Sequence, residues 1–199
     1  MQILIVFGLA LLTGTTQRSP FNSYQVFLSP RTLPGACSSD LNEFRNRTYT
    51  FRSGIYPSDS PLTLHDGEAV ERNMFGTPEW ETSLARADRV NVDGMEAVLL
   101  VIGANHVNGT GGATHVMVTR CRDGQLVVLF EASGEGVRDA SFGTTFELTV
   151  TRWVWSSNDG HCCPSKEAEE RYKWGRARRF VRVSRTERPV RRESAARRG

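Results

Sequence analysis

The sequence predicts a single α+β domain that is rich in β structure and contains a mainly antiparallel sheet. Its length of 199 residues suits one domain with tails. The 18 glycines, together with the many Val, Thr and Phe residues of the second half, favour strands over helices. Apolar runs separated by Asp-Gly are typical of β-hairpins, and hairpins join antiparallel neighbours.

The first 39 residues are expected to lie outside this domain. Ile3–Leu12 is a run of ten apolar residues. As a helix it would rise only about 15 Å, too little to cross a bilayer core of about 30 Å. Such a run is typical of a secretory signal peptide, which we assign to residues 1–17. The alternative is a buried strand of the mature domain. Residues 18–39 are rich in Ser, Pro and Arg and are expected to form a linker.

The domain is expected to span residues 40–184 and to begin with short strands. Arg47–Phe51 and Leu62–His65 are strand candidates, and Asp66-Gly67 after the second is a turn signal. Pro78–Ala87 is ambiguous, since Thr-Pro-Glu suits a helix start while the apolar residues have the spacing of a strand. We expect a short helical or irregular entry there, followed by a strand.

The middle of the chain carries the strongest strand signals. Ala97–Ile102 is continuously apolar, as expected for a central strand covered on both faces. Gly103–Gly112 is rich in Gly and Asn and is expected to be a mobile loop. Ala113–Arg120 and Gln125–Glu131 flank Asp123-Gly124, which predicts a hairpin.

The last part of the domain is predicted to be a further set of antiparallel strands. Thr145–Trp155 alternates so that Phe146, Leu148, Val150, Arg152 and Val154 share one face. Lys166–Trp174 has strong helix formers, but its apolar residues recur at period two. Both interpretations are possible, and we favour a final hairpin with Phe180–Val183 as its second strand.

Residues 185–199 are expected to form a disordered basic tail. They contain six arginines and two glutamates, a charge of 6 − 2 = +4, whereas the whole chain carries +3. One valine is too little apolar surface to offset the entropy of ordering. Weak contact with an anionic surface is the interaction that we expect of this tail. Nucleic-acid binding is not expected, because no aromatic residues interleave with the arginines.

The four cysteines, Cys37, Cys121, Cys162 and Cys163, are all disulfide candidates in an exported chain. Cys162 and Cys163 follow the turn-forming Asn158-Asp159-Gly160 and precede Pro164, so they mark a tight corner. We expect Cys37 or Cys121 to pair with one member of this doublet.

Several segments occur in the same order in a known group of proteins. The run Asp159-x-x-Cys162-Cys163-Pro164-Ser165, followed by Tyr172-x-Trp174, is the most specific of them. It resembles a motif of exported bacterial proteins that are similar to the LppP/LprE-type lipoproteins. The resemblance covers residues 41–183 and implies a secreted or cell-envelope protein, periplasmic or extracellular, of unknown biochemical role.

The same family often has a calcium loop, Asp-x-Asn-x-Asp-Gly, near the position of Asp93. Here Asp88, Asn91 and Asp93 are spaced three and two residues apart, so the alternating ligand geometry fails. The sequence therefore predicts a β-turn at Asp93-Gly94 and no calcium site.

His161, Cys162 and Cys163 offer two alternatives to a structural corner. Imidazole and thiolate bind zinc or copper, with a further ligand from His65, His106, His115 or Cys121. However, adjacent side chains seldom point at one ion. A thiol-dependent enzyme would need a base within hydrogen-bond reach, which sequence adjacency does not provide.

The remaining candidate site is aromatic. Trp153, Trp155, Tyr172 and Trp174 flank the cysteine corner and would bind a glycan or an envelope protein, or simply fill the core. The sequence carries neither a Gly-x-Ser-x-Gly nucleophile elbow nor a phosphate-binding P-loop. We therefore expect a non-catalytic binding or structural module without cofactor or metal. The alternative is a thiol-dependent enzyme or a metal-binding protein using the His-Cys-Cys run.

Overall fold

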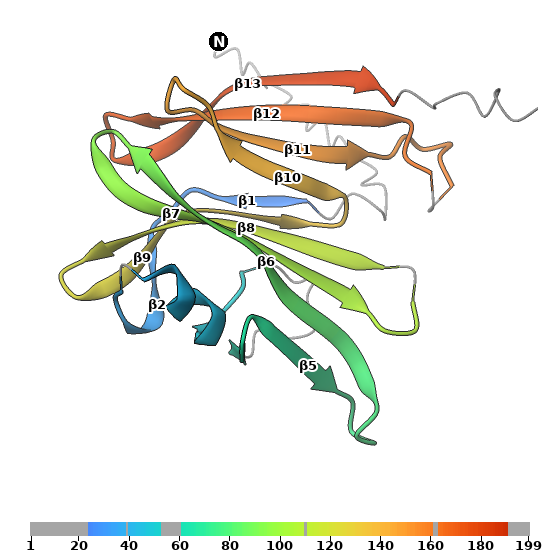
Figure 1. Cartoon of the computed structure of the whole chain (residues 1–199). Helices are drawn as coiled ribbons and strands as arrows, with labels where there is room; N and C mark the ends of the chain where they lie inside the picture. The colour runs from blue at the N-terminus through green and yellow to red at the C-terminus, as the bar shows by residue number, and fades with distance from the viewer. Residues whose placement is uncertain (1–23, 39, 53–60, 110, 161–162, 191–199) are drawn as a thin grey trace, which may run out of the picture.

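The computed structural model describes residues 24–38, 40–52, 61–109, 111–160 and 163–190. A seven-stranded sheet packs face to face against a four-stranded sheet, as Figure 1 shows, and a two-stranded sheet covers the other face of the larger one. Within the described residues the strands are β1 (Gln25–Phe27), β2 (Arg31–Ala36), β3 (Thr48–Tyr49), β4 (Leu62–Thr63), β5 (Glu68–Arg72), β6 (Pro78–Val92), β7 (Met95–His106), β8 (Gly112–Arg122), β9 (Gln125–Gly134), β10 (Val137–Phe142), β11 (Leu148–Val154), β12 (Lys166–Gly175) and β13 (Arg179–Pro189).

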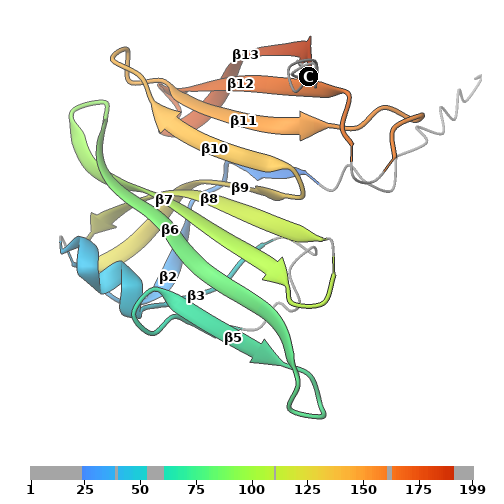
Figure 2. The same ribbon diagram turned by 45° about the vertical axis from the view of Figure 1, so that its right-hand side comes forward.

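The larger sheet has the order β1-β9-β8-β7-β6-β5, and β2 also pairs with β9. Strands β5 to β9 follow one another as a meander, while β1 and β2 add to the outer edge of β9 one after the other. The smaller sheet, β10-β11-β12-β13, is a second meander. The chain crosses from one sheet to the other in the short connection between β9 and β10, which Figure 2 shows from a second side.

Two cores lie on the two faces of the larger sheet because its central strands alternate. On β7, Leu100 and Ile102 face the 3-10 helix η1 (Leu41–Asn46), β3 and β4, where they pack with Phe44 and Tyr49. Residues of the opposite parity, such as Leu99, face the smaller sheet. The inter-sheet core also contains Val116, Val118, Phe130, Leu148, Val150, Tyr172 and Phe180. The double coverage explains why β7 is apolar at almost every position.

The predicted β-rich, antiparallel architecture is confirmed, but the helical part of the α+β class finds little support. Within the described residues the helix is the 3-10 helix η1 (Leu41–Asn46), capped by the Asp40 side chain. None of the described helices is long and apolar enough to cross a membrane. The helical or irregular entry expected at residues 78–87 is wrong, since β6 starts at Pro78 and pairs along β5 and β7. Pro78 is tolerated because it is the first residue of the strand.

The Asp-Gly turns are confirmed. Asp93-Gly94 and Asp123-Gly124 both have positive φ at the two positions, the geometry of the turns that match the twist of a hairpin. The Asn91 side chain accepts a hydrogen bond from the Gly94 amide at 2.8 Å, so that its oxygen braces the turn. The final hairpin is also confirmed, because β12 and β13 pair over their whole length.

Several expected boundaries differ in the structure. Part of the expected linker forms β1 and β2, because Leu33 is buried in the core and the backbone pairs with β9. Part of the expected tail belongs to β13, where Arg188 lies 2.7 Å from Glu167 on the neighbouring strand. The expected loop at residues 103–112 is shorter, since β7 continues to His106 and β8 begins at Gly112. Phe146 is exposed with φ 57° and precedes β11 instead of belonging to its inner face. The expected signal peptide lies outside the described residues.

Candidate functional site

A cleft of the described structure opens between the two sheets, beside the β6–β7 and β12–β13 turns, and these turns are seen on the left in Figure 1. Its volume is about 590 Å³, within the range of ordinary small-molecule sites. The lining residues come from four strands, β7, β8, β9 and β12, and from the connections beside them: Pro30, Asp93, Met95, Arg120, Arg122, Val127, Leu129, Trp174, Gly175, Arg176 and Arg178. The stacking of the sheets thus brings together residues that are distant in the sequence.

The cleft is strongly basic. Four arginines line it against one carboxylate, that of Asp93, so the lining carries 4 − 1 = +3. Arg122 forms a partial ion pair with the neighbouring Asp123 at 3.4 Å. In the part of the chain that the structure describes, no carboxylate lies within 4.0 Å of the guanidinium of Arg176 or Arg178. The cleft therefore presents positive charge that the fold itself does not neutralise.

Strand alternation places the two arginines of β8 in this cleft. Val116 and Val118 face the smaller sheet, so Arg120 and Arg122, two and four residues after Val118, have the same orientation beyond the end of the core. The guanidinium of Arg120 contacts the Met95 sulfur, and its Nε is buried without a hydrogen-bond partner.

The other two arginines lie on the β12–β13 turn. The amide of Arg178 donates to the carbonyl of Gly175 at 2.9 Å, which closes the turn. Arg178 has φ 53°, in the left-handed region that favours glycine. Both arginine side chains are exposed at the mouth of the cleft.

The inner part of the cleft is apolar. Leu129 is buried, and Met95, Val127 and Trp174 are half-buried and pack against the inter-sheet core. The Trp174 ring meets Phe180 edge-on, with 5.3 Å between the ring centroids. The charged groups are thus at the mouth, and the apolar groups line the interior.

The four aromatic residues expected to form one surface are divided between two faces of the smaller sheet. Tyr172 is buried in the core, where it contacts Phe130, and burial raises the pKa of its phenol. Trp174 is on the same inner face and lines the cleft. Trp153 is instead on the outer face, because its parity on β11 is opposite to that of Val150, and Trp155, directly after the strand, has the same parity as Trp153.

On the outer face, an arginine side chain lies over one of the two tryptophan rings. The Arg138 guanidinium lies 4.2 Å from the centroid of the Trp153 ring and pairs with Glu167 at 2.9 Å. Trp155 passes close to Gly136, where a Cβ would lie 2.5 Å from the indole ring. The charge of Arg138 is thus paired with a carboxylate, in contrast to the charges of Arg176 and Arg178 in the cleft.

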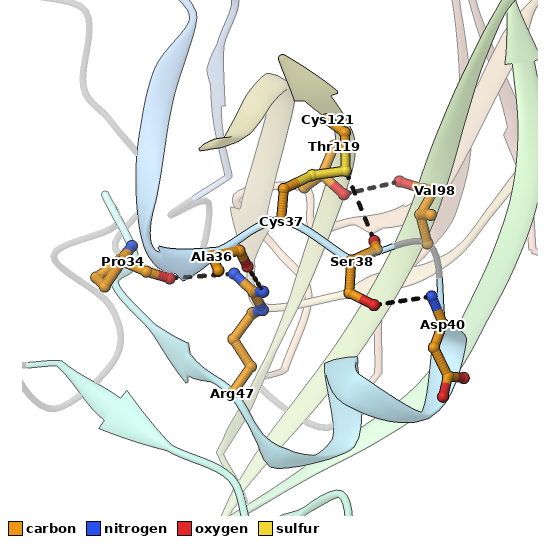
Figure 3. Close-up of a disulfide and its surroundings, with 9 residues drawn as sticks. All are labelled: Pro34, Ala36, Cys37, Ser38, Asp40, Arg47, Val98, Thr119 and Cys121. Carbon is orange, nitrogen blue, oxygen red and sulfur yellow. Dashed lines mark hydrogen bonds between the residues drawn. A yellow bond between two sulfur atoms is a disulfide. The ribbon is translucent and has the colours of Figure 1, made fainter. Parts of the chain in front are cut away.

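The expected disulfide pairing is wrong. Cys37 pairs with Cys121, with 5.6 Å between the Cα atoms, and not with the doublet. The bond ties the segment after β2 to the end of β8, and Figure 3 shows Arg47 beside it, donating to the carbonyls of Pro34 and Ala36. The pairing follows from β2 and β8 flanking β9, a neighbourhood that the sequence does not reveal.

The corner around the doublet is braced by a side chain. Asp159 Oδ2 accepts hydrogen bonds from the amides of Ser156 and Ser165 at 2.6 and 2.9 Å, and from the Ser165 hydroxyl at 2.7 Å. Cys163 is disulfide-bonded, while His161 and Cys162 lie outside the described residues. The outer residues of the Asp-x-x-Cys-Cys-Pro-Ser run thus hold a turn in place.

Sequence reasoning missed a Ser-His contact. His115 Nδ1 and Ser133 Oγ lie 2.8 Å apart on β8 and β9, within the reach of a nucleophile and base. Both residues are fully buried, and the His115 ring stacks on Phe51 at 4.0 Å. Burial lowers the pKa of His115 to about 3, which makes the imidazole a weak base at neutral pH. The pair is therefore a core contact.

Two buried carboxylates are also held by arginines. Glu131 pairs with Arg31 at 3.0 Å and accepts a hydrogen bond from the Arg52 amide. Glu170 is fully buried on β12, lies 3.3 Å from Arg152 and accepts a hydrogen bond from the Tyr172 hydroxyl. Each carboxylate has its partners inside the fold, so these clusters stabilise the sandwich and leave no open site. The described residues contain no group of three His, Cys, Asp or Glu side chains placed to hold a metal ion.

Comparisons with family models, with curated proteins and with solved structures found no match to this chain.

Proposed function

We propose that the protein is a non-catalytic binding module of the exported or cell-envelope compartment, and that its inter-sheet cleft binds an anionic ligand. The observation that carries the proposal is the unbalanced lining of the cleft, four arginines against one aspartate. A positive potential in a concave, low-dielectric site attracts anions and raises their local concentration. The partner that fits is an acidic glycan, an acidic segment of an envelope protein or a small organic anion.

The disulfide supports the proposed compartment. A bond between Cys37 and Cys121 persists in an oxidising environment such as the periplasm or the cell exterior, and is rare in the cytosol. The resemblance of the Cys-Cys-Pro-Ser segment to exported bacterial proteins supports the same compartment.

Equilibrium titration tests the binding function. The full chain is titrated by calorimetry with inorganic pyrophosphate, a heparin-derived tetrasaccharide and a triglutamate peptide. We expect saturable one-to-one binding of at least one probe. The variant Arg176→Gln/Arg178→Gln should weaken that binding by about tenfold or more, because charge-assisted hydrogen bonds contribute about 1.5–3 kcal/mol each.

The matched control is Arg72→Gln/Arg138→Gln, which removes the same charge from the β5–β6 hairpin and from the outer aromatic surface. Binding by this control should resemble the wild type. Equal losses in both double variants would mean general charge attraction, and a loss in the control alone would assign the ligand to the Trp153 surface. Either result, or no saturable binding of any probe, contradicts the proposal.

The competing proposal is a thiol-dependent enzyme that uses the cysteine doublet. A Cys162→Ser/Cys163→Ser variant separates the two. If it folds normally but loses a turnover that the wild type shows, the non-catalytic assignment fails. Under our proposal the variant keeps the anion affinity of the wild type, since Cys163 is not among the described residues that line the cleft.

A further inference from the structure

We propose that the ligand of the cleft is an amphiphilic organic phosphate, with its phosphate held at the mouth by the arginines and its apolar portion inserted between the sheets. This inference rests on the proposed function and specifies the chemical class of the ligand.

The first argument is the distribution of polarity in the cleft. Arg122, Arg176 and Arg178 are exposed at the mouth, whereas Leu129 and Trp174 form part of an apolar interior that continues into the inter-sheet core. A small hydrophilic anion would leave this apolar surface exposed to water, and a neutral apolar ligand would give the guanidinium groups no anionic partner. A ligand with an anionic head and an apolar body matches both parts.

The second argument is the amount of charge. The lining carries 4 − 1 = +3, and one carboxylate group supplies only a single negative charge. A phosphate monoester carries about −1.5 to −2 at neutral pH and offers three acceptor oxygens. Guanidinium forks bind such oxygens in pairs, so two or three of the four arginines can contact one phosphate. Arg120 and Arg122 lie two residues apart on β8, and both line the cleft.

The third argument is the conformation of Arg178. An arginine at φ 53° costs conformational free energy that glycine at the same turn position would not. The guanidinium of Arg178 lines the cleft, so the turn carries a charged side chain there in place of the less strained glycine. Arg178→Gly should therefore stabilise the turn and weaken ligand binding at the same time.

The experiment measures the dissociation constants of three probes for the full chain at pH 7.5: decyl phosphate, inorganic pyrophosphate and decyl maltoside. Decyl phosphate has both the anionic head and the apolar body, and each of the others has only one. We expect decyl phosphate to bind at least tenfold more tightly than either. Arg178→Gln and Arg178→Gly should each weaken it by about tenfold, Arg72→Gln should not, and Arg178→Gly should raise the Tm by about 2–4 °C.

Vesicles with and without phosphatidic acid distinguish the source of the phosphate. Binding of decyl phosphate together with phosphatidic acid vesicles supports a lipid headgroup, and binding of decyl phosphate alone supports a soluble organic phosphate.

Two results would overturn the inference but leave the proposed function intact. One is Arg178-dependent binding of pyrophosphate that is as tight as that of decyl phosphate, which means a site for the anion alone. The other is Arg178-dependent binding of the tetrasaccharide or the triglutamate peptide with no binding of decyl phosphate. A third result also overturns the inference. If decyl maltoside binds as tightly as decyl phosphate, and Arg178→Gln does not change either affinity, the cleft is an apolar groove that does not select for phosphate. Absence of binding by every probe overturns both proposals.

Discussion

Removal of the Cys37–Cys121 disulfide should destabilise the protein through its unfolded state. The double variant Cys37→Ala/Cys121→Ala deletes a link between positions that are 84 residues apart in the sequence. In the folded protein the same segment is also held by Arg47, which donates to the carbonyls of Pro34 and Ala36. The native geometry should therefore persist, and most of the loss should come from the greater freedom of the unfolded chain.

The separation of the cysteines gives the magnitude. The chain-entropy estimate for a loop of 84 residues is about 4–5 kcal/mol, and measured values for disulfides are typically about 2–4 kcal/mol. We expect the free energy of unfolding to fall by about 3–4 kcal/mol. For a chain of this length the Tm should fall by about 6–16 °C.

Urea unfolding followed by tryptophan fluorescence measures this loss. The comparison of interest is the wild type against the double variant without reductant, because a reductant would also open the disulfide of Cys163. A change of less than about 1 kcal/mol, with equal m-values, would refute the entropic reasoning. A further loss on adding reductant to the double variant would report the contribution of the bond at Cys163.

Three further predictions concern the core and the turns. Burial lowers the pKa of His115 from an ordinary 6.5 to about 3. As the pH falls below 6.5, the imidazole therefore takes up its proton in the unfolded chain before it does so in the folded chain, and the free energy of unfolding decreases. Between pH 7 and pH 5 the free energy of unfolding in urea should drop by about 2 kcal/mol more in the wild type than in His115→Gln, and equal slopes would contradict the assignment. Tyr49→Phe removes the hydrogen bond of 2.7 Å to the buried Phe44 carbonyl and should cost about 1–2 kcal/mol in the same assay; no change would mean that the carbonyl finds another donor. Gly124→Ala, at φ 74°, should lower the Tm by about 2–4 °C in calorimetry, since alanine is strained there; an unchanged Tm would show that the turn adapts.

The parts of the fold that the sequence predicts well are those with local causes. The hairpin at Asp123-Gly124 is specified by residues that tolerate positive φ between two apolar runs. The inner face of β11 follows from the alternation of Leu148 and Val150. The final hairpin overrides the helix propensity of Lys166–Trp174 because Tyr172 and its period-two neighbours are buried on one face.

The parts that sequence patterns miss depend on distant partners. The composition of Arg31–Ala36 predicts a linker, yet this segment pairs with β9. Arg31 also donates a hydrogen bond to the carboxylate of Glu131, 100 residues further along the chain. The pairing of Cys37 with Cys121 is one of three equally allowed connectivities of four cysteines. The cleft is the clearest case. Arg120 and Arg178 line one cleft only because the two sheets stack, and neither arginine has a local motif that signals a site.

The most direct test of the cleft as the ligand site is an amide chemical-shift titration of the full, ¹⁵N-labelled chain with the anionic probe that binds most tightly in the calorimetric titrations. Our account predicts saturable shifts confined to the residues around Asp93, Arg120 and Arg178, with the β5–β6 hairpin unaffected. Shifts centred on Arg138 and Trp153, or shifts that grow linearly without saturation, would contradict it.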